Sequence, residues 1–316
     1  FQQHCGDTGS QQDFRTRRYL HLIRNFHRYS WLLLYLFGAS PVTCICFARG
    51  RQHNLQEYDP STLYLPNATC LRMGSLGYRS EAQQSLFVCY NDLQSYVDSL
   101  GSAMKTVYPP YQEIGNGADG EPQQMNSNLL QLENEFYSTV RPKRTTQSGE
   151  RPLSALLRGG IEYVEVRALD LDPFEPIGIS MEQARFLDTF LLYCLLSESP
   201  ECNRAEQQEI SANLEKVIEQ GRDPKLQLSR QGEPLSLPEW ANSLLDDMAH
   251  AAILLDAAKN LSVHSESLDS QREKVRDPNL TASGRLLNAM GETGKPFYKF
   301  GMDLSTAHQQ HLTSRP

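Results

Sequence analysis

The order of apolar and polar residues along the chain predicts several long helices. Ser10 and Asp13 have the spacing of a helix cap, and apolar residues from Tyr19 to Leu33 recur at helical intervals. We therefore expect a helix that begins near Ser10 and stops at Gly38. The same periodicity predicts further helices, which are typical of packing elements, at residues 91–106, 181–196, 205–220 and 238–258.

Residues 161–170 (IEYVEVRALD) alternate in the manner of a strand. Tyr163, Glu165 and Arg167 share one face, and small apolar residues share the other. A carboxylate that can bind Mg²⁺ beside a guanidinium that can bind phosphate indicates phosphoryl transfer. A structural ion pair on a half-exposed strand is the alternative. Because Glu162 and Glu165 point to opposite faces, the pattern does not favour the paired acids of a glycosidase.

A second strand is expected at residues 129–137, where Glu133, Glu135 and Tyr137 share one face. Two acids at this spacing repel each other unless a cation lies between them, so a cation shared with Glu165 is one hypothesis. Residues 141–144 (RPKR) then form a basic loop. This loop suits phosphate oxygens, or it is a turn that its charges keep soluble.

Composition narrows the classes of function. The chain has 316 residues, with 30 basic and 38 acidic side chains and a net charge of −8, and no long basic tract marks a nucleic-acid interface.

The apolar run at residues 31–48 is interrupted by a Gly-Ala-Ser-Pro sequence, so we expect no membrane span. Residues 115–120 (GNGADG) match the dinucleotide fingerprint formally, but no helix pattern follows, and a turn at Asp119-Gly120 is the better interpretation.

Seven scattered cysteines without a C-x-x-C motif predict reduced thiols in a cytoplasmic protein, not a disulfide framework or a zinc site. Cys44 and Cys46 are expected to be buried thiols. The polar last fifty residues suggest a disordered end.

Several blocks of sequence occur together in a fixed order. They are residues 35–41 (YLFGASP), 69–78 (TCLRMGSLGY), 133–144 (ENEFYSTVRPKR) and 157–160 (LRGG), the last leading into the strand of Glu165. The chain closely resembles the bacterial glutamate-cysteine ligase family, and the likeness extends from about residue 1 to about residue 300.

The resemblance implies an α+β fold in which an antiparallel sheet, curved into a funnel, is surrounded by helices as in glutamine synthetase. Residues 1–300 would form one catalytic-domain fragment, mainly helical over 1–110, with active-site strands over 111–180 and helices over 181–300, followed by a polar tail at 301–316. The complete enzyme is expected to be a cytoplasmic monomer that binds neither nucleic acid nor membranes.

The resemblance also implies a reaction and its residues. ATP phosphorylates the γ-carboxylate of L-glutamate, and the amine of L-cysteine attacks the acyl phosphate, which is the first step of glutathione biosynthesis. Glu165 resembles a ligand of Mg²⁺, which Mn²⁺ could replace, and Arg167 resembles the cation beside the transferring phosphoryl group. Arg72, Tyr78 and Tyr137 resemble residues of the cysteine pocket. ATP is the co-substrate.

The chain departs from the family at its start. Phe1 corresponds to the middle of the family sequence, so the chain resembles the carboxy-terminal two thirds of such an enzyme and lacks further magnesium ligands and strands. We expect it to be inactive alone. Two interpretations stay open: an incomplete ligase, or a noncatalytic binding or regulatory remnant of one.

Overall fold

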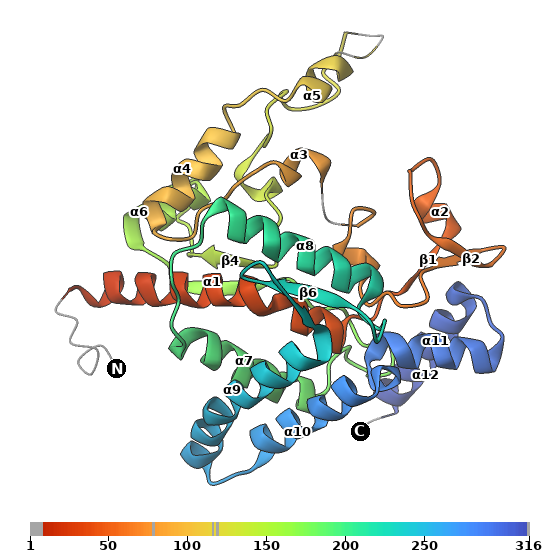
Figure 1. Cartoon of the computed structure of the whole chain (residues 1–316). Helices are drawn as coiled ribbons and strands as arrows, with labels where there is room; N and C mark the ends of the chain where they lie inside the picture. The colour runs from red at the N-terminus through yellow and green to blue at the C-terminus, as the bar shows by residue number, and fades with distance from the viewer. Residues whose placement is uncertain (1–8, 78–79, 116, 118–119, 315–316) are drawn as a thin grey trace. The chain divides into compact units, whose positions relative to one another are not determined.

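Helix α1 (Gln11–Phe37) begins at the predicted cap. The backbone N–H of Asp13 donates to Ser10 Oγ at 3.0 Å, and Ser10 Oγ donates to Asp13 Oδ2 at 2.7 Å. The helix ends at Gly38, as predicted. The computed structural model, shown in Figure 1, describes residues 9–77, 80–115, 117 and 120–314, so the turn expected at Asp119 lies outside the described residues.

The chain divides into two units. Unit 1 lies within residues 1–27, 79–167 and 197–207, and unit 2 within residues 28–78, 168–196 and 208–316. Two of the divisions between the units fall inside α1 and inside α8 (Arg204–Gln220).

Unit 1 combines short helices with one two-stranded antiparallel sheet, β4–β5. Its core gathers apolar side chains of α1, α4 and α6, among them Ile23, Phe26, Leu100 and Leu156. The elements that lie wholly within this unit are α3 (Glu81–Gln84), α4 (Leu93–Ala103), α5 (Pro109–Ile114), the 3-10 helix η2 (Glu133–Glu135), β4 (Val140–Lys143), α6 (Pro152–Gly159) and β5 (Tyr163–Val166).

Unit 2 is mainly helical, with a three-stranded antiparallel sheet in the order β1-β3-β2 and a β6–β7 hairpin. The hairpin leads directly into α9, whose neighbour is α10 (Figure 1). The elements that lie wholly within unit 2 are β1 (Val42–Cys44), α2 (Ile45–Ala48), β2 (Gln56–Asp59), β3 (Thr62–Tyr64), η1 (Leu71–Met73), α7 (Met181–Leu196), β6 (Gln227–Arg230), β7 (Glu233–Ser236), α9 (Leu237–Lys259), α10 (Val263–Arg276), η3 (Pro278–Leu280), α11 (Ala282–Thr293) and α12 (Phe297–Thr313).

Aromatic side chains fill the core of unit 2. The rings of Trp31 and Trp240 lie 4.8 Å apart between centroids, and Phe37 meets Phe186 edge-on at 5.4 Å. Residues 31–37 at the end of α1 are all buried, which explains their unbroken apolar sequence. This burial accounts for the run that imitates a membrane span, and no helix among the described residues has the length and apolar character to cross a membrane.

Two predictions about local structure are wrong. Residues 129–137 form turns and η2, not a strand, because their backbone groups bond elsewhere: Leu129 N–H donates to Thr106 O and Leu130 N–H to Ala103 O. Residues 141–143, expected in a basic loop, belong to strand β4.

Two further expectations fail at the surface. The polar end of the chain, where disorder was expected, is helical through Thr313. Cys44 and Cys46 were expected to be buried, but Cys44 is only half-buried and Cys46 is exposed.

Candidate active site

Strand β5 carries the acid and the guanidinium that the sequence singled out. Glu165 and Arg167 point to the same side, as predicted, and form a two-pronged ion pair. Arg167 Nη2 donates to Glu165 Oε1 at 3.1 Å, and Arg167 Nε lies 3.1 Å from Glu165 Oε2. Lys143 on β4 adds a second cation, since its Nζ lies 3.6 Å from Glu165 Oε2. One carboxylate is thus held by two cations.

The local sequence allows this pairing of strands. Pro142 lies opposite Val164 in the β4–β5 pair. Hydrogen-bonded and non-hydrogen-bonded pairs alternate along antiparallel strands. The hydrogen bond from Arg167 N–H to Thr139 O at 2.8 Å fixes this alternation, and it makes Pro142 and Val164 a non-hydrogen-bonded pair. The missing N–H of the proline therefore costs no hydrogen bond, and a proline is tolerated inside β4.

The charges around Glu165 hold its carboxylate ionised. Burial opposes ionisation, but the hydrogen bond from Arg167 and the positive charges of Lys143, Arg167 and Arg141 outweigh it and lower the pKa of Glu165. Arg141 lies opposite Glu165 and is buried, which lowers the pKa of its guanidinium. Glu165 Oε2 is itself buried and accepts no hydrogen bond from the described residues. This oxygen can still accept a cation.

Tyr137 joins this group through the backbone. Its hydroxyl donates to Arg167 O at 3.1 Å, and its N–H donates to Gln83 Oε1 at 3.1 Å. The tyrosine therefore fixes the backbone at the end of β5, and its side chain is half-buried.

The neighbouring acids do not join Glu165. Glu133 accepts from Leu153 N–H at 3.0 Å and pairs with Arg151 at 3.0 Å, while Glu135 accepts from Gln131 N–H. Within the described residues, no group of three His, Cys, Asp or Glu side chains could hold a metal. The hypothesis of a cation shared by these three glutamates is wrong.

Arg72 lies in unit 2 and is held by a buried aspartate. Arg72 Nε lies 2.5 Å from Asp170 Oδ1, and Nη2 donates to Leu169 O at 2.8 Å. Asp170 Oδ2 also accepts from Ser40 Oγ at 2.7 Å and from Ala39 N–H at 2.8 Å. These contacts fix the guanidinium, so Arg72 is not a loose surface arginine.

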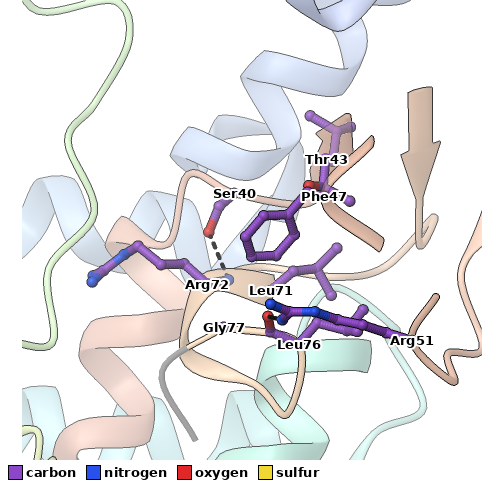
Figure 2. Close-up of a pocket in the computed structure, with 9 residues that line it drawn as sticks. Ser40, Thr43, Phe47, Arg51, Leu71, Arg72, Leu76 and Gly77 are labelled. Carbon is purple, nitrogen blue, oxygen red and sulfur yellow. Dashed lines mark hydrogen bonds between the residues drawn. The ribbon is translucent and has the colours of Figure 1, made fainter. Parts of the chain in front are cut away.

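A cavity of about 360 Å³ borders Arg72. Figure 2 shows the ring of Phe47 facing Leu71, and the side chain of Arg72 leading away from these apolar groups. Arg51 lies 5.0 Å from the centre of the Phe47 ring and donates to Leu76 O at 2.7 Å. The remaining lining residues are Ser40, Val42, Thr43 and Gly77.

The structure thus brings some of the predicted site residues together. Glu165 and Arg167 are in direct contact, and Tyr137 bonds to the backbone of Arg167. Arg72 belongs to the other unit. Tyr78 lies outside the described residues.

Two contributors were missed by sequence reasoning. Asp170 ends the run of sequence that contains Glu165, and a buried acid needs a cation as its partner, which the half-buried Arg72 supplies. Lys143 was assigned to a loop, and only its pairing with β5 places it beside Glu165.

The glutamate-cysteine ligase profile matches residues 1–217, which is more than half of the chain. The chain belongs to the glutamate-cysteine ligase family. Curated glutamate-cysteine ligases from Pseudomonas fluorescens Pf-5 and Azotobacter vinelandii are 51% and 52% identical to this chain over 310 and 305 residues. These alignments cover 98% and 96% of this chain and 58% of each relative.

A solved structure of a glutamate-cysteine ligase gives the same result for the fold. The enzyme from Francisella tularensis, in complex with AMP, matches with a TM-score of 0.88 and 32% identity, covering 99% of this chain and 61% of that one. The predicted α+β class is confirmed, although the described strands form small sheets with fewer strands than a funnel requires. The chain spans about 58% of the length of its curated glutamate-cysteine ligase relatives.

Proposed function

We propose that this chain is part of an enzyme that uses ATP to join the γ-carboxylate of L-glutamate to the amine of L-cysteine through a γ-glutamyl phosphate. This would be the first step of glutathione biosynthesis. The observation that carries the proposal is the contact of Glu165 with Arg167 and Lys143 in a chain of this family. The AMP complex of the Francisella relative supports a nucleotide as co-substrate.

The two cations fit the needs of phosphoryl transfer. The transferring group carries negative charge on its oxygens, and catalysis is largely positioning and neutralisation of that charge. Arg167 offers a planar fork for two phosphate oxygens, and Lys143 offers a point charge. Both now contact Glu165, so we propose that nucleotide binding transfers Arg167 and Lys143 from the carboxylate to the phosphates.

Glu165 fits a role as one ligand of Mg²⁺ or Mn²⁺. The fit rests on its Oε2, which is buried and accepts no hydrogen bond from the described residues, and on the lowered pKa that keeps the carboxylate ionised. Mg²⁺ in nucleotide enzymes commonly takes one or two carboxylates, with phosphates and water as its other ligands. When bound, the ion would neutralise the phosphate oxygens and hold them in place.

Arg72, Tyr78 and Tyr137 are proposed to bind L-cysteine. Support for Arg72 comes from Asp170, which fixes its guanidinium, and from the apolar cavity that Arg72 helps to line, which suits a small thiol side chain. Tyr137 supplies a half-buried ring close to Arg167. The cysteine amine would then attack the acyl carbon of the γ-glutamyl phosphate. As the C–N bond forms, the amine would lose a proton and phosphate would leave the acyl carbon.

The test measures ADP release with Mg²⁺, ATP, L-glutamate and L-cysteine, omitting each amino acid in turn. It compares this chain with the complete product of its reading frame. We expect release that depends on both amino acids in the complete product only, with γ-glutamylcysteine formed in equal amount. A folded complete product that releases no ADP would contradict the proposal and favour a noncatalytic binding role.

A further inference from the structure

Two cysteines lie together where β1 passes into α2. Cys44 is the last residue of β1, paired with Thr62 of β3, and Cys46 follows two residues later. The backbone N–H of Cys46 donates to Cys44 Sγ across 3.4 Å. Cys46 is exposed and Cys44 is half-buried, so solvent can reach the pair. The proposed ligase chemistry uses neither thiol.

The surroundings distinguish the two thiols. The side chain and backbone N–H of Cys46 donate hydrogen bonds to Cys44 Sγ, which lowers the pKa of Cys44. The same contact raises the pKa of Cys46. Arg49 contributes a positive charge that favours the thiolate of both. Reactive cysteines occur in such electropositive, partly exposed places.

Two cysteines elsewhere in unit 2 show the contrast. Cys70 and Cys194 are fully buried, and burial raises the pKa of each thiol well above its ordinary value. Buried thiols of this kind are inert towards reagents in water. Within unit 2, the thiols that can react with reagents in water are therefore those of Cys44 and Cys46.

We propose that Cys44 and Cys46 form a thiol–disulfide exchange site that accepts a small disulfide carrying carboxylates. The Cys44 thiolate attacks one sulfur of the small disulfide, forms a mixed disulfide and expels one thiolate, which takes up a proton. Cys46 then loses its proton and attacks Cys44 Sγ, which closes a Cys44–Cys46 disulfide and expels the second thiolate. The protein loses two electrons and two protons, and the small disulfide becomes two thiols.

Neighbouring residues supply space and charge for the small disulfide. Thr43 and Phe47, which flank the pair in sequence, both line the cavity of unit 2. Arg51 also lines it, and Arg49 follows α2 directly. A carboxylate-bearing disulfide can therefore place its charges near two arginines while its sulfurs reach Cys44.

The experiment treats the whole chain with glutathione disulfide and maps each cysteine by peptide mass spectrometry over time. In the wild type we expect a Cys44–Cys46 disulfide that excess reduced glutathione reverses. Cys46→Ser should accumulate a mixed disulfide on Cys44, and Cys44→Ser should react at Cys46 at least about tenfold more slowly. Equal rates in the two variants, or modification of Cys89 and Cys202 without a Cys44–Cys46 disulfide, would overturn the proposal.

A second comparison tests the carboxylate part. The double variant Arg49→Gln, Arg51→Gln should slow reaction with glutathione disulfide more than reaction with the neutral 2-hydroxyethyl disulfide. An equal loss with both reagents would show that the arginines do not recognise carboxylates and would remove this part of the proposal. Because the readout is covalent mass, it does not depend on ligase activity.

Discussion

Buried carboxylates organise unit 2 at the scale of single residues. Asp170 bonds Ala39, Ser40 and Arg72, and so connects the end of α1 to η1. Asp256 has the corresponding role between α9 and α10. One oxygen accepts from the N–H and Nδ1 of His264 at 2.9 Å, and the other accepts from the N–H and Oγ of Ser265.

Asp256 thereby caps α10 from another helix. The residue before α10, Ser262, caps none of its N–H groups with its side chain. Burial opposes ionisation of Asp256, but the four hydrogen bonds to its carboxylate outweigh that effect and lower its pKa. A lowered pKa in the folded state stabilises the protein above the unfolded pKa, and this stabilisation is lost as the pH falls through the folded value.

We expect Asp256→Asn to lower the free energy of unfolding by about 2 kcal/mol at pH 7, because an amide nitrogen would face the N–H and Oγ of Ser265. Below about pH 3.9 the difference from the wild type should shrink by about 1.4 kcal/mol per pH unit. Urea titrations between pH 7 and pH 3 measure this difference in the free energy of unfolding.

Asp247→Asn is the matched control, because Asp247 is exposed on the same helix. It should change the free energy of unfolding by less than about 0.5 kcal/mol. A difference between the Asp256 variant and the wild type that stays constant with pH would show that its carboxylate charge is not what stabilises α10.

At the scale of elements, the end of α1 depends on close contact of backbones. A Cβ on Gly38 would lie 2.4 Å from Leu34 O and 2.8 Å from Thr69 O. Neither carbonyl belongs to a flexible side chain, so the backbone itself would have to move.

We expect Gly38→Ala to lower the free energy of unfolding by about 2 kcal/mol or more. The control is Gly301→Ala in α12 of the same unit, where a Cβ meets no atom within 4 Å. That change should raise stability by about 0.5 to 1 kcal/mol, because alanine favours a helix. Denaturant unfolding followed by circular dichroism compares the two, and equal effects would refute the steric account.

The sequence was sufficient for the long helices but not for the elements around the site. The periodicity of residues 181–196 and 205–220 predicted α7 and α8, and the Ser10 cap and Gly38 located the ends of α1. Residues 129–137 alternate like a strand, yet their N–H groups bond to Ala103 at the end of α4, to Thr106 and to Glu135. Alternation alone does not reveal whether a partner strand is present.

Contacts between residues that are far apart in the sequence could not be predicted either. Glu165 and Arg167 could be placed on one face because they are two residues apart in a strand. Lys143 and Asp170 could not be placed, since their partners are fixed by the register of β4–β5 and by the packing of residues 168–170 in unit 2. Family resemblance supplied roles for residues, and the structure supplied the contacts.

At the scale of the whole molecule, the chain spans about 58% of the length of its curated relatives. Its described residues place Glu165 beside Arg167 and Lys143, and they contain no group of three His, Cys, Asp or Glu side chains that could hold a metal. We therefore expect phosphoryl transfer to require the complete product of the reading frame.

The most direct test of this account is ADP release dependent on both L-glutamate and L-cysteine, measured for the complete product and for two variants. Glu165→Gln removes the proposed metal ligand. Glu162→Gln is the matched control, because Glu162 is exposed near the start of the same strand and accepts from Thr145 N–H. Thermal unfolding of each protein confirms that it is folded.

We expect Glu165→Gln to lower kcat by about 100-fold or more, because it removes a proposed ligand of the ion that would neutralise the transferring phosphate. Glu162→Gln should retain activity within about threefold of the wild type. Equal activity of the two folded variants would contradict the assignment of Glu165 to the phosphoryl-transfer site.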